Sequence, residues 1–373
     1  MYINSEQCLQ IEATLEKIKS GVDLMLGYPV SQDFDYSLLN EFLKYPINNI
    51  GDPFESSTNK IQTHKMETQV VDFFAKMFRA NPKDYWGYVT NGGSESNLYG
   101  LYIARELYPG AMVYFSNSTH YSIKKNIRLL NIPSIVIRSL KNGEIDYEDL
   151  ENTLQYNRDK PAIILTNFGT TMKEAKDDVA KIKKVLKRSA IQDHYIHCDA
   201  ALSGPYGAFL EPRVPFDFED GADSISISGH KFIGSPIPSG VIITKRSSKD
   251  RIAKGVAYIG SMDTTITGSR NGHSPLFLWY GIHKMGIEGL KARYKHSEEV
   301  AEYCKNELNK IGIKAWKNRG AITVVFPKTS EKLKEKWQLA TDDISHIICM
   351  PNITKTQIDL FIADVTKEQE KNM

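Results

Sequence analysis

Lys231 lies in the stretch of this 373-residue chain whose residue types are best suited to chemistry. Two β-type runs, Ser224–Ser228 and Gly240–Thr244, flank a turn rich in Gly, Ser and Pro that carries the lysine after Ser-Gly-His. A lysine amine forms a Schiff base with a carbonyl compound, and burial lowers its pKa toward a reactive value. An ordinary solvated lysine in a loop is the alternative. Lys231 is therefore predicted to be reactive only if other stretches fit the same chemistry.

A second stretch, Thr90–Asn97, has the composition of a phosphate-binding turn. It reads TNGGSESN and lies between a strand-like segment and a helical one. The paired glycines and the hydroxyl of Ser94 suit a phosphate, because a helix N-terminus offers free N–H groups and a partial positive charge. Ser94 with Asn97 also fits an ordinary helix cap, so the stretch alone leaves both interpretations open. No Gly-Lys-Ser/Thr follows, which excludes a Walker A loop.

Two further residues follow strand-like segments and have side chains that suit a flat ring. Asp199 closes the run IHCD, and a carboxylate at the end of a buried strand needs a cationic or proton-donating partner. A protonated pyridine nitrogen is such a partner, and the small Ala201 leaves room for the ring. His120, in the run STHYS, could stack on that ring. Each also has a plain structural explanation, Asp199 as a helix cap and His120 as a packed histidine.

The elements that would position these residues alternate along the chain from about residue 60. Strand-like runs are followed by stretches with helical periodicity, which indicates a mostly parallel sheet with helices on both faces. Ligands of such sheets bind at the carboxyl ends of the strands, where the candidate residues fall. The expected strands are 85–90, 113–116, 134–138, 162–167, 195–198, 224–228 and 240–244, and the expected helices are 66–79, 94–107, 123–130, 146–155 and 177–187.

The whole chain is expected to form a large α/β domain with two smaller parts. We predict an N-terminal segment over 1–58, the large domain over 59–275 and a small α+β domain over 276–373. Residues 255–275 are rich in Gly, Ser and Thr and are expected to form a long loop, of which 258–273 is expected to close over a bound ligand. Residues 4–20 have helical periodicity, and we expect a second subunit to cover their apolar face.

Composition limits the classes of protein to which the chain can belong. With 41% hydrophobic and 25% charged residues and a net charge of +2, it lacks the basic excess of proteins that bind nucleic acid or anionic membranes. Its four cysteines, Cys8, Cys198, Cys304 and Cys349, are scattered without a zinc-ligand pattern, so we expect no metal site and a reducing, cytoplasmic location. No stretch approaches the roughly 18 apolar residues of a membrane span.

The candidate residues follow one another in a specific order: phosphate turn, histidine, Gly-Thr-Thr, aspartate and then Ser-Gly-His-Lys. That order resembles the group II amino-acid decarboxylases, which are pyridoxal-phosphate enzymes of fold type I. Within this family the chain is most similar to bacterial histidine decarboxylases and plant serine decarboxylases. The matching motifs are FDY at 34–36, INN at 47–49, WGYVTNGG at 86–93, NGEIDY at 142–147, DAALSG at 199–204, SGHKFIGSPIP at 228–238 and GSRNGH at 268–273.

The resemblance implies a role for each candidate residue. Lys231 would hold pyridoxal 5'-phosphate as a Schiff base, Asp199 would pair with the pyridinium nitrogen, and His120 would stack on the ring. The implied fold is that of the fold type I transferases, with the cofactor in the large domain. The other residues expected at the cofactor are Gly93, Ser94 and His230 at its phosphate, Thr170 and Ala201 near its ring, and Ser228.

The resemblance also implies the reaction, which is the decarboxylation of an L-amino acid. L-Histidine, giving histamine and CO2, is the first choice of substrate, because the bacterial relatives similar in length and motifs act on it. L-Serine, giving ethanolamine, is the alternative, since NNIGDPF at 48–54 and WQLA at 337–340 look more like the serine enzymes. Transamination or C–S cleavage would use the same lysine and aspartate, and a non-enzymatic cofactor-binding protein or a pyruvoyl enzyme are further alternatives.

Subunit organisation follows from the same resemblance, because the family places its active site between subunits. A homodimer or a dimer of dimers is therefore expected. In relatives a loop after the lysine reaches the neighbouring site, which identifies Thr267 and Ser269 as cross-subunit phosphate contacts and Arg270 as their anchor. The chain departs from the family pattern at Ser96 and Glu174, which replace usual glycines, and at Ser239, which replaces a usual cysteine.

Overall fold

A computed structural model of the protein describes residues 4–252, 254–256 and 261–371. The chain forms two compact units, one of Val30–Lys295 and one that joins Met1–Pro29 to His296–Met373. These limits differ from the expected domain limits after residues 58 and 275. No helix in the described part of the chain is long and apolar enough to cross a membrane.

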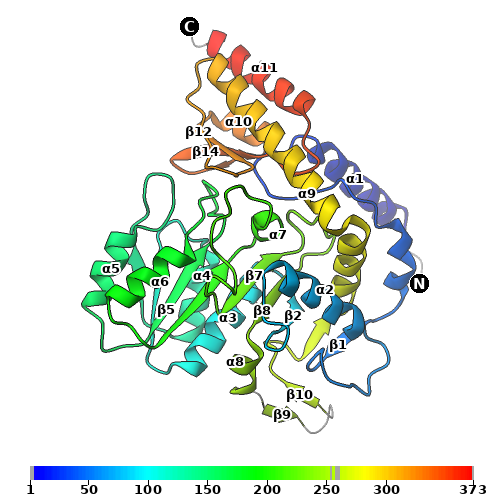
Figure 1. The fold of residues 1–373 in the computed structure, drawn as a ribbon. Coiled ribbons are helices and arrows are strands. Elements are labelled where there is room, and N and C mark those ends of the chain that lie inside the picture. Colours follow the sequence, from blue (N-terminus) through cyan, green and yellow to red (C-terminus); the bar gives the residue numbers. More distant parts are fainter. Residues whose placement is uncertain (1–3, 253, 257–260, 372–373) are drawn as a thin grey trace. The chain divides into compact units, whose positions relative to one another are not determined.

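The larger unit is built on a seven-stranded sheet with the strand order β2-β8-β7-β6-β5-β3-β4 (Figure 1). Neighbouring strands from β7 to β4 pair in parallel, whereas β8 pairs antiparallel with both β7 and β2. The strands are β2 (Trp86–Thr90), β3 (Met112–Ser116), β4 (Ser134–Ile137), β5 (Ala162–Asn167), β6 (His194–Asp199), β7 (Ser224–Ser228) and β8 (Gly240–Thr244). The carboxyl ends of β2, β3, β5, β6 and β7 therefore lie at one edge of this sheet.

Alternate residues of the strands face two separate cores, because successive side chains of a strand point to opposite faces. Val113 and Leu165 pack with residues of α3 and α4, whereas Tyr114 and Ile164 pack with residues of α5 and α6. Helices on both faces of a mostly parallel sheet confirm the predicted fold class. The helices of this unit are η1 (Ser37–Lys44), α2 (His64–Met77), α3 (Gly93–Leu107), α4 (Ser122–Leu130), α5 (Tyr147–Gln155), α6 (Val179–Arg188), α7 (Gly204–Gly207) and α8 (Arg246–Asp250).

The Gly-, Ser- and Thr-rich segment is partly regular, contrary to the expectation of one long loop. β9 (Lys254–Val256) pairs antiparallel with β10 (Ser261–Asp263), and β11 (Ser269–Asn271) pairs antiparallel with β1 (Asn48–Ile50). Strands of three residues are too short to leave a periodic pattern in the sequence. Residues 257–260 lie outside the described residues, and with them the first three residues, 258–260, of the expected closing loop.

The smaller unit contains an antiparallel sheet in the order β12 (Thr323–Pro327), β14 (Ile344–Ile348) and β13 (Ala340–Thr341). Its helices are α1 (Ser5–Val22), α10 (Glu331–Lys336), α11 (Lys355–Lys371) and the part of α9 (His273–Lys310) that follows Lys295. Gly286 interrupts α9 with φ of 62°. α1 has no buried residue, and Leu9, Ile11, Leu15 and Ile18 on it are 49–64% exposed.

Candidate active site

The structure brings Lys231, Asp199 and His120 into one electrostatic environment at the carboxyl edge of the sheet. Lys231 follows β7 in the turn that leads to β8, and its side chain is half-buried. Burial lowers the pKa of its amine, while the charge of Asp199 acts in the opposite direction. A lysine in this setting is neutral more often than one in water, and the neutral amine is the form that makes a Schiff base.

Asp199 is the last residue of β6 and its carboxylate is fixed by two donors. Nδ2 of Asn97 donates to Oδ2 over 2.8 Å, and the backbone N–H of Ala201 donates to Oδ1 over 3.2 Å. In the sheet Asp199 is paired with Asn167 on β5 and Ser226 on β7, so it lies between the carboxyl ends of two neighbouring strands. The carboxylate is thus buried and oriented before any cofactor binds.

His120 lies in the turn between β3 and α4, and its ring makes one defined contact. Nδ1 lies 2.8 Å from the hydroxyl of Ser122 and 3.3 Å from the backbone nitrogen of Ser122, whose N–H can only donate. Nδ1 is therefore the acceptor, and Nε2 carries the proton of the neutral ring. Burial lowers the pKa of His120, the charge of Asp199 raises it, and Lys231 lowers it further.

The predicted phosphate turn follows β2 and lies against residues at the ends of β7 and β6. Gly93 is the first residue of α3, and a Cβ on it would lie 2.7 Å from Oγ of Ser228 and 3.6 Å from Cβ of Ala201. The side chain of Ser228 therefore leaves little room for a side chain at position 93. Ser94 follows in the first turn of the helix and is exposed.

Ser96 replaces a usual glycine, and the structure accommodates it by hydrogen bonding. Its buried hydroxyl lies 2.7 Å from Oγ1 of Thr90 and 3.3 Å from the carbonyl of Gly92. A Cβ on Gly240 would lie 2.8 Å from the Ser96 hydroxyl, so the glycine in the facing strand provides the space. The substitution leaves the helix N-terminus in place.

Thr170 and His230 lie in the turns after β5 and β7 and are held by backbone contacts. Oγ1 of the buried Thr170 accepts from the N–H of Ala175 over 2.9 Å. Nδ1 of His230 lies 2.9 Å from the carbonyl oxygen of Ser239. Burial lowers the pKa of His230, and Lys231 adds to that effect.

Glu174, the second departure, forms a buried ion pair that closes the turn of Thr170. Its backbone has φ of 49°, a conformation that glycine adopts more readily than other residues. Its carboxylate accepts from Nζ of Lys176 over 3.0 Å, from the hydroxyl of Tyr206 over 2.7 Å and from Ser203 over 3.3 Å. These contacts stabilise a charge that would be costly to bury alone.

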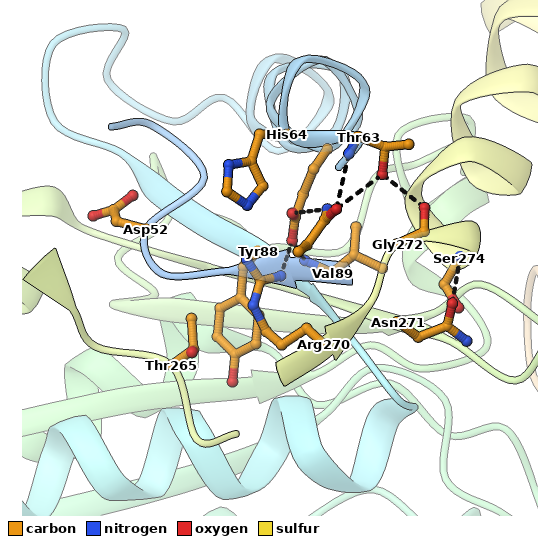
Figure 2. Close-up of polar contacts among 12 residues, drawn as sticks. Asp52, Thr63, His64, Tyr88, Val89, Thr265, Arg270, Asn271, Gly272 and Ser274 are labelled. Carbon is orange, nitrogen blue, oxygen red and sulfur yellow. Dashed lines mark hydrogen bonds and ion pairs between the residues drawn. The ribbon is translucent and has the colours of Figure 1, made fainter. Parts of the chain in front are cut away.

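Arg270 is anchored inside the larger unit by a buried ion pair (Figure 2). Its Nη1 pairs with Oε1 of Glu67, its Nη2 donates to the carbonyl of Gly51 over 3.0 Å, and its guanidinium lies 5.2 Å from the ring centre of Tyr88. The same oxygen of Glu67 accepts from the N–H of Val89 on β2 over 2.8 Å. Arg270 therefore ties β11 to the strand that precedes the phosphate turn.

Thr267 and Ser269 flank this anchor and differ in their surroundings. Ser269 is exposed, and its hydroxyl accepts from Nδ2 of Asn48 over 3.1 Å. The buried hydroxyl of Thr267 has no hydrogen-bond partner among the residues that the structure describes. Neither hydroxyl bonds to Lys231 within the described part of one chain, so their predicted role depends on a second subunit.

Sequence reasoning missed the residues that support Asp199 from behind. Asn97 stands in the phosphate turn and His197 in the run IHCD, so both were in motifs that the sequence singled out. Their link to Asp199 depends on how α3 packs against β6 and β7, which local sequence does not encode. Among the described residues there is no group of three His, Cys, Asp or Glu side chains that could hold a metal ion.

Comparison with known proteins agrees with this geometry. The pyridoxal-dependent decarboxylase conserved domain matches residues 24–326. A histidine decarboxylase of Mesorhizobium japonicum is 50% identical over 357 residues, which cover 96% of this chain and 97% of the relative, and one of Morganella morganii is 45% identical over 91% of each chain. The solved L-methionine decarboxylase of Streptomyces sp. 590 is 25% identical with a TM-score of 0.89, over 98% of this chain and 96% of its own.

A solved glutamate decarboxylase of Lactobacillus brevis, 18% identical with a TM-score of 0.81 over 98% of this chain and 92% of its own, shares the fold. The family match covers most of the chain and includes every residue of the edge described above. The chain belongs to the pyridoxal-dependent decarboxylases, carboxy-lyases that use pyridoxal 5'-phosphate, as its sequence motifs predicted.

Proposed function

We propose that this protein decarboxylates L-histidine to histamine and CO2, with Lys231 holding the cofactor. The half-buried Lys231 beside Asp199 and His120 is the observation that carries the proposal. Histidine is favoured as substrate by the relatives from Mesorhizobium japonicum and Morganella morganii, which match nearly the whole chain. L-Serine is the alternative substrate.

The residues at the edge of the sheet fit pyridoxal phosphate in size and charge. The N-terminus of α3, with Gly93, Ser94, Ser228 and His230 around it, suits the phosphate group, because backbone N–H groups and the helix dipole attract an anion. The ring would lie against Ala201, Thr170 and His120, with Asp199 at its nitrogen. When bound, this cofactor supplies a sink for the electron pair left on Cα as CO2 departs.

The side chains of the protein would each perform one task in that reaction. The lowered pKa of Lys231 keeps part of its amine neutral, which is the form that would hold the cofactor as a Schiff base. The Asp199 carboxylate would hold a proton at the ring nitrogen. His120 would stack on the ring, and Ser122 fixes the tautomer of the His120 imidazole.

A panel of amino acids assayed for CO2 release tests the reaction and the substrate together. The proposal predicts histamine from L-histidine at a rate far above that of ethanolamine from L-serine. Release of CO2 from L-serine alone would mean that serine is the substrate. A keto acid formed without CO2 would indicate transamination, and a thiol formed without CO2 would indicate C–S cleavage.

We also propose a cytoplasmic homodimer, in which a second copy covers the apolar side chains of α1 and receives Thr267 and Ser269 at its phosphate. The exposed Leu9, Ile11, Leu15 and Ile18 support a partner surface. Cys8, Cys198 and Cys304 form no disulfide among the residues that the structure describes, which suits a reducing compartment. Light scattering of the active enzyme tests the dimer, and a monomeric mass would contradict it.

A further inference from the structure

Asp199 is supported by a chain of hydrogen bonds that runs away from the active-site edge into the sheet. Asn97 on α3 contacts Asp199, His197 on β6 contacts Asn97, and Ser224 on β7 contacts His197. All four side chains are at least 90% buried. We name Ser224, His197 and Asn97 the Asp199 relay.

The direction of each hydrogen bond in the relay follows from the carboxylate at its end. An ionised carboxylate only accepts, so the Asn97 amide must turn its Nδ2 toward Asp199 and its Oδ1 toward His197 and Ser226. Oδ1 only accepts as well, so Nε2 of His197, 2.9 Å away, must carry the proton. Nδ1 is then bare and accepts from the hydroxyl of Ser224 over 2.7 Å.

The surroundings of His197 keep its ring neutral and in one orientation. Burial lowers the pKa of His197 to about 3, so the imidazole carries no charge near neutral pH. On the helix side, a Cβ on Gly100 would fall on the His197 ring, which means that α3 confines the ring directly. The relay can therefore adopt only one arrangement of protons at neutral pH.

We propose that His197 and Asn97 are positioning residues that aim the Asp199 carboxylate at the ring nitrogen of the cofactor. The proposal rests on the role of Asp199 in the proposed function. Nδ2 of Asn97 at Oδ2 and the N–H of Ala201 at Oδ1 together fix the orientation of the carboxylate. Because His197 is neutral, it orients Asn97 without adding a positive charge that would compete with the pyridinium for the carboxylate.

The test compares two cofactors that differ at one atom. Apoenzyme is titrated with pyridoxal phosphate and with its 1-deaza analogue, in which carbon replaces the ring nitrogen, and the ratio of the two dissociation constants is measured. Wild-type protein should prefer the natural cofactor. His197→Phe should lower that preference by up to about tenfold, because it removes the hydrogen bond that orients the Asn97 amide. His197→Gln, which retains a donor for Asn97, should keep most of it.

Cys198→Ala is the matched control, since Cys198 is buried on the same strand between His197 and Asp199 but points to the other face. It should change neither constant by more than about twofold. An unchanged preference in His197→Phe would overturn the relay. Wild-type protein that binds both cofactors equally would instead overturn the pairing of Asp199 with the ring nitrogen, and with it the proposed function.

A second measurement needs no substitution and therefore does not depend on whether a variant folds. Nitrogen-15 NMR of histidine-labelled holoenzyme reports which ring nitrogen of each histidine carries a proton. The relay predicts a neutral His197 with its proton on Nε2 between pH 6 and pH 8, in slow exchange with water. An imidazolium or a proton on Nδ1 in that range would contradict it.

Discussion

Gly93 lies directly against Ser228: a Cβ at position 93 would stand 2.7 Å from the Ser228 hydroxyl. This contact joins the first turn of α3 to the end of β7, the strand that leads to Lys231. We predict that Gly93→Ala weakens the binding of pyridoxal phosphate by about tenfold or more, because the added methyl group separates the helix N-terminus from the lysine strand. Fluorescence titration of the apoenzyme measures the dissociation constant of pyridoxal phosphate.

Gly21→Ala is the control for that substitution, since its Cβ would make only an ordinary contact of 3.6 Å with Gln338. Its dissociation constant for pyridoxal phosphate should equal that of the wild type. Equal constants in Gly93→Ala as well would mean that the phosphate binds elsewhere.

Replacing Lys231 tests the covalent attachment of the cofactor. Lys231→Ala should remove both turnover and the visible absorbance of the lysine–cofactor adduct, because no other amine in the site is proposed to form it. Borohydride reduction followed by mass spectrometry should find the cofactor on residue 231 in wild type alone. A reducible adduct in the variant would assign the Schiff base to another lysine.

Replacing Asp199 tests the electron sink separately from attachment. Asp199→Asn should fold and still bind the cofactor through Lys231, but lose most of its turnover, because a neutral amide cannot hold a proton on the ring nitrogen. The rate of CO2 release from L-histidine and the visible spectrum are the two measurements. A near-normal rate with a normal spectrum would show that the proton at the ring nitrogen is dispensable.

The lysine turn was predictable from the sequence because its determinants are local. The runs around Lys231 coincide with β7 and β8, and Asp199 closes β6 as its position after an apolar run required. A short, buried, largely apolar strand bounded by turn residues can be recognised in a single sequence. The candidate residues that follow such strands could be picked out in the sequence for the same reason.

The support of those residues was not predictable, because it depends on partners far apart in the sequence. His197 and Asn97 are 100 positions apart and meet only after α3 packs on the sheet. Arg270 was predicted to anchor its loop, but its partner Glu67 lies 203 positions away on α2. The pairing of β1 with β11 likewise joins distant segments, and strands of three residues are too short to show a hydrophobic periodicity in the sequence.

Glu174, which replaces a glycine of the family pattern, forms a buried ion pair with Lys176. The free energy of unfolding shows how much this ion pair contributes to stability. Glu174→Ala should lower the free energy of unfolding by about 3–5 kcal/mol, because it removes the carboxylate from a buried ammonium. The double variant Glu174→Gly with Lys176→Met should recover most of the loss, since it removes both charges and suits the left-handed backbone at 174. Urea unfolding compares the three proteins, and a double variant as unstable as Glu174→Ala would refute the pair as the cause.

His197 makes the folded protein sensitive to acid, and the sign of the effect follows from its pKa. Burial holds the pKa of the folded state at about 3, against an ordinary value of 6.5, so protonation favours the unfolded chain. The stabilising contribution is complete above pH 6.5 and is lost as the pH falls toward 3. At pH 5 the loss is about 2 kcal/mol. Between pH 7 and pH 5, the free energy of unfolding of His197→Gln should fall by about 2 kcal/mol less than that of the wild type. Urea unfolding at both pH values measures this difference. Parallel losses in the two proteins would show that His197 titrates normally in the folded state.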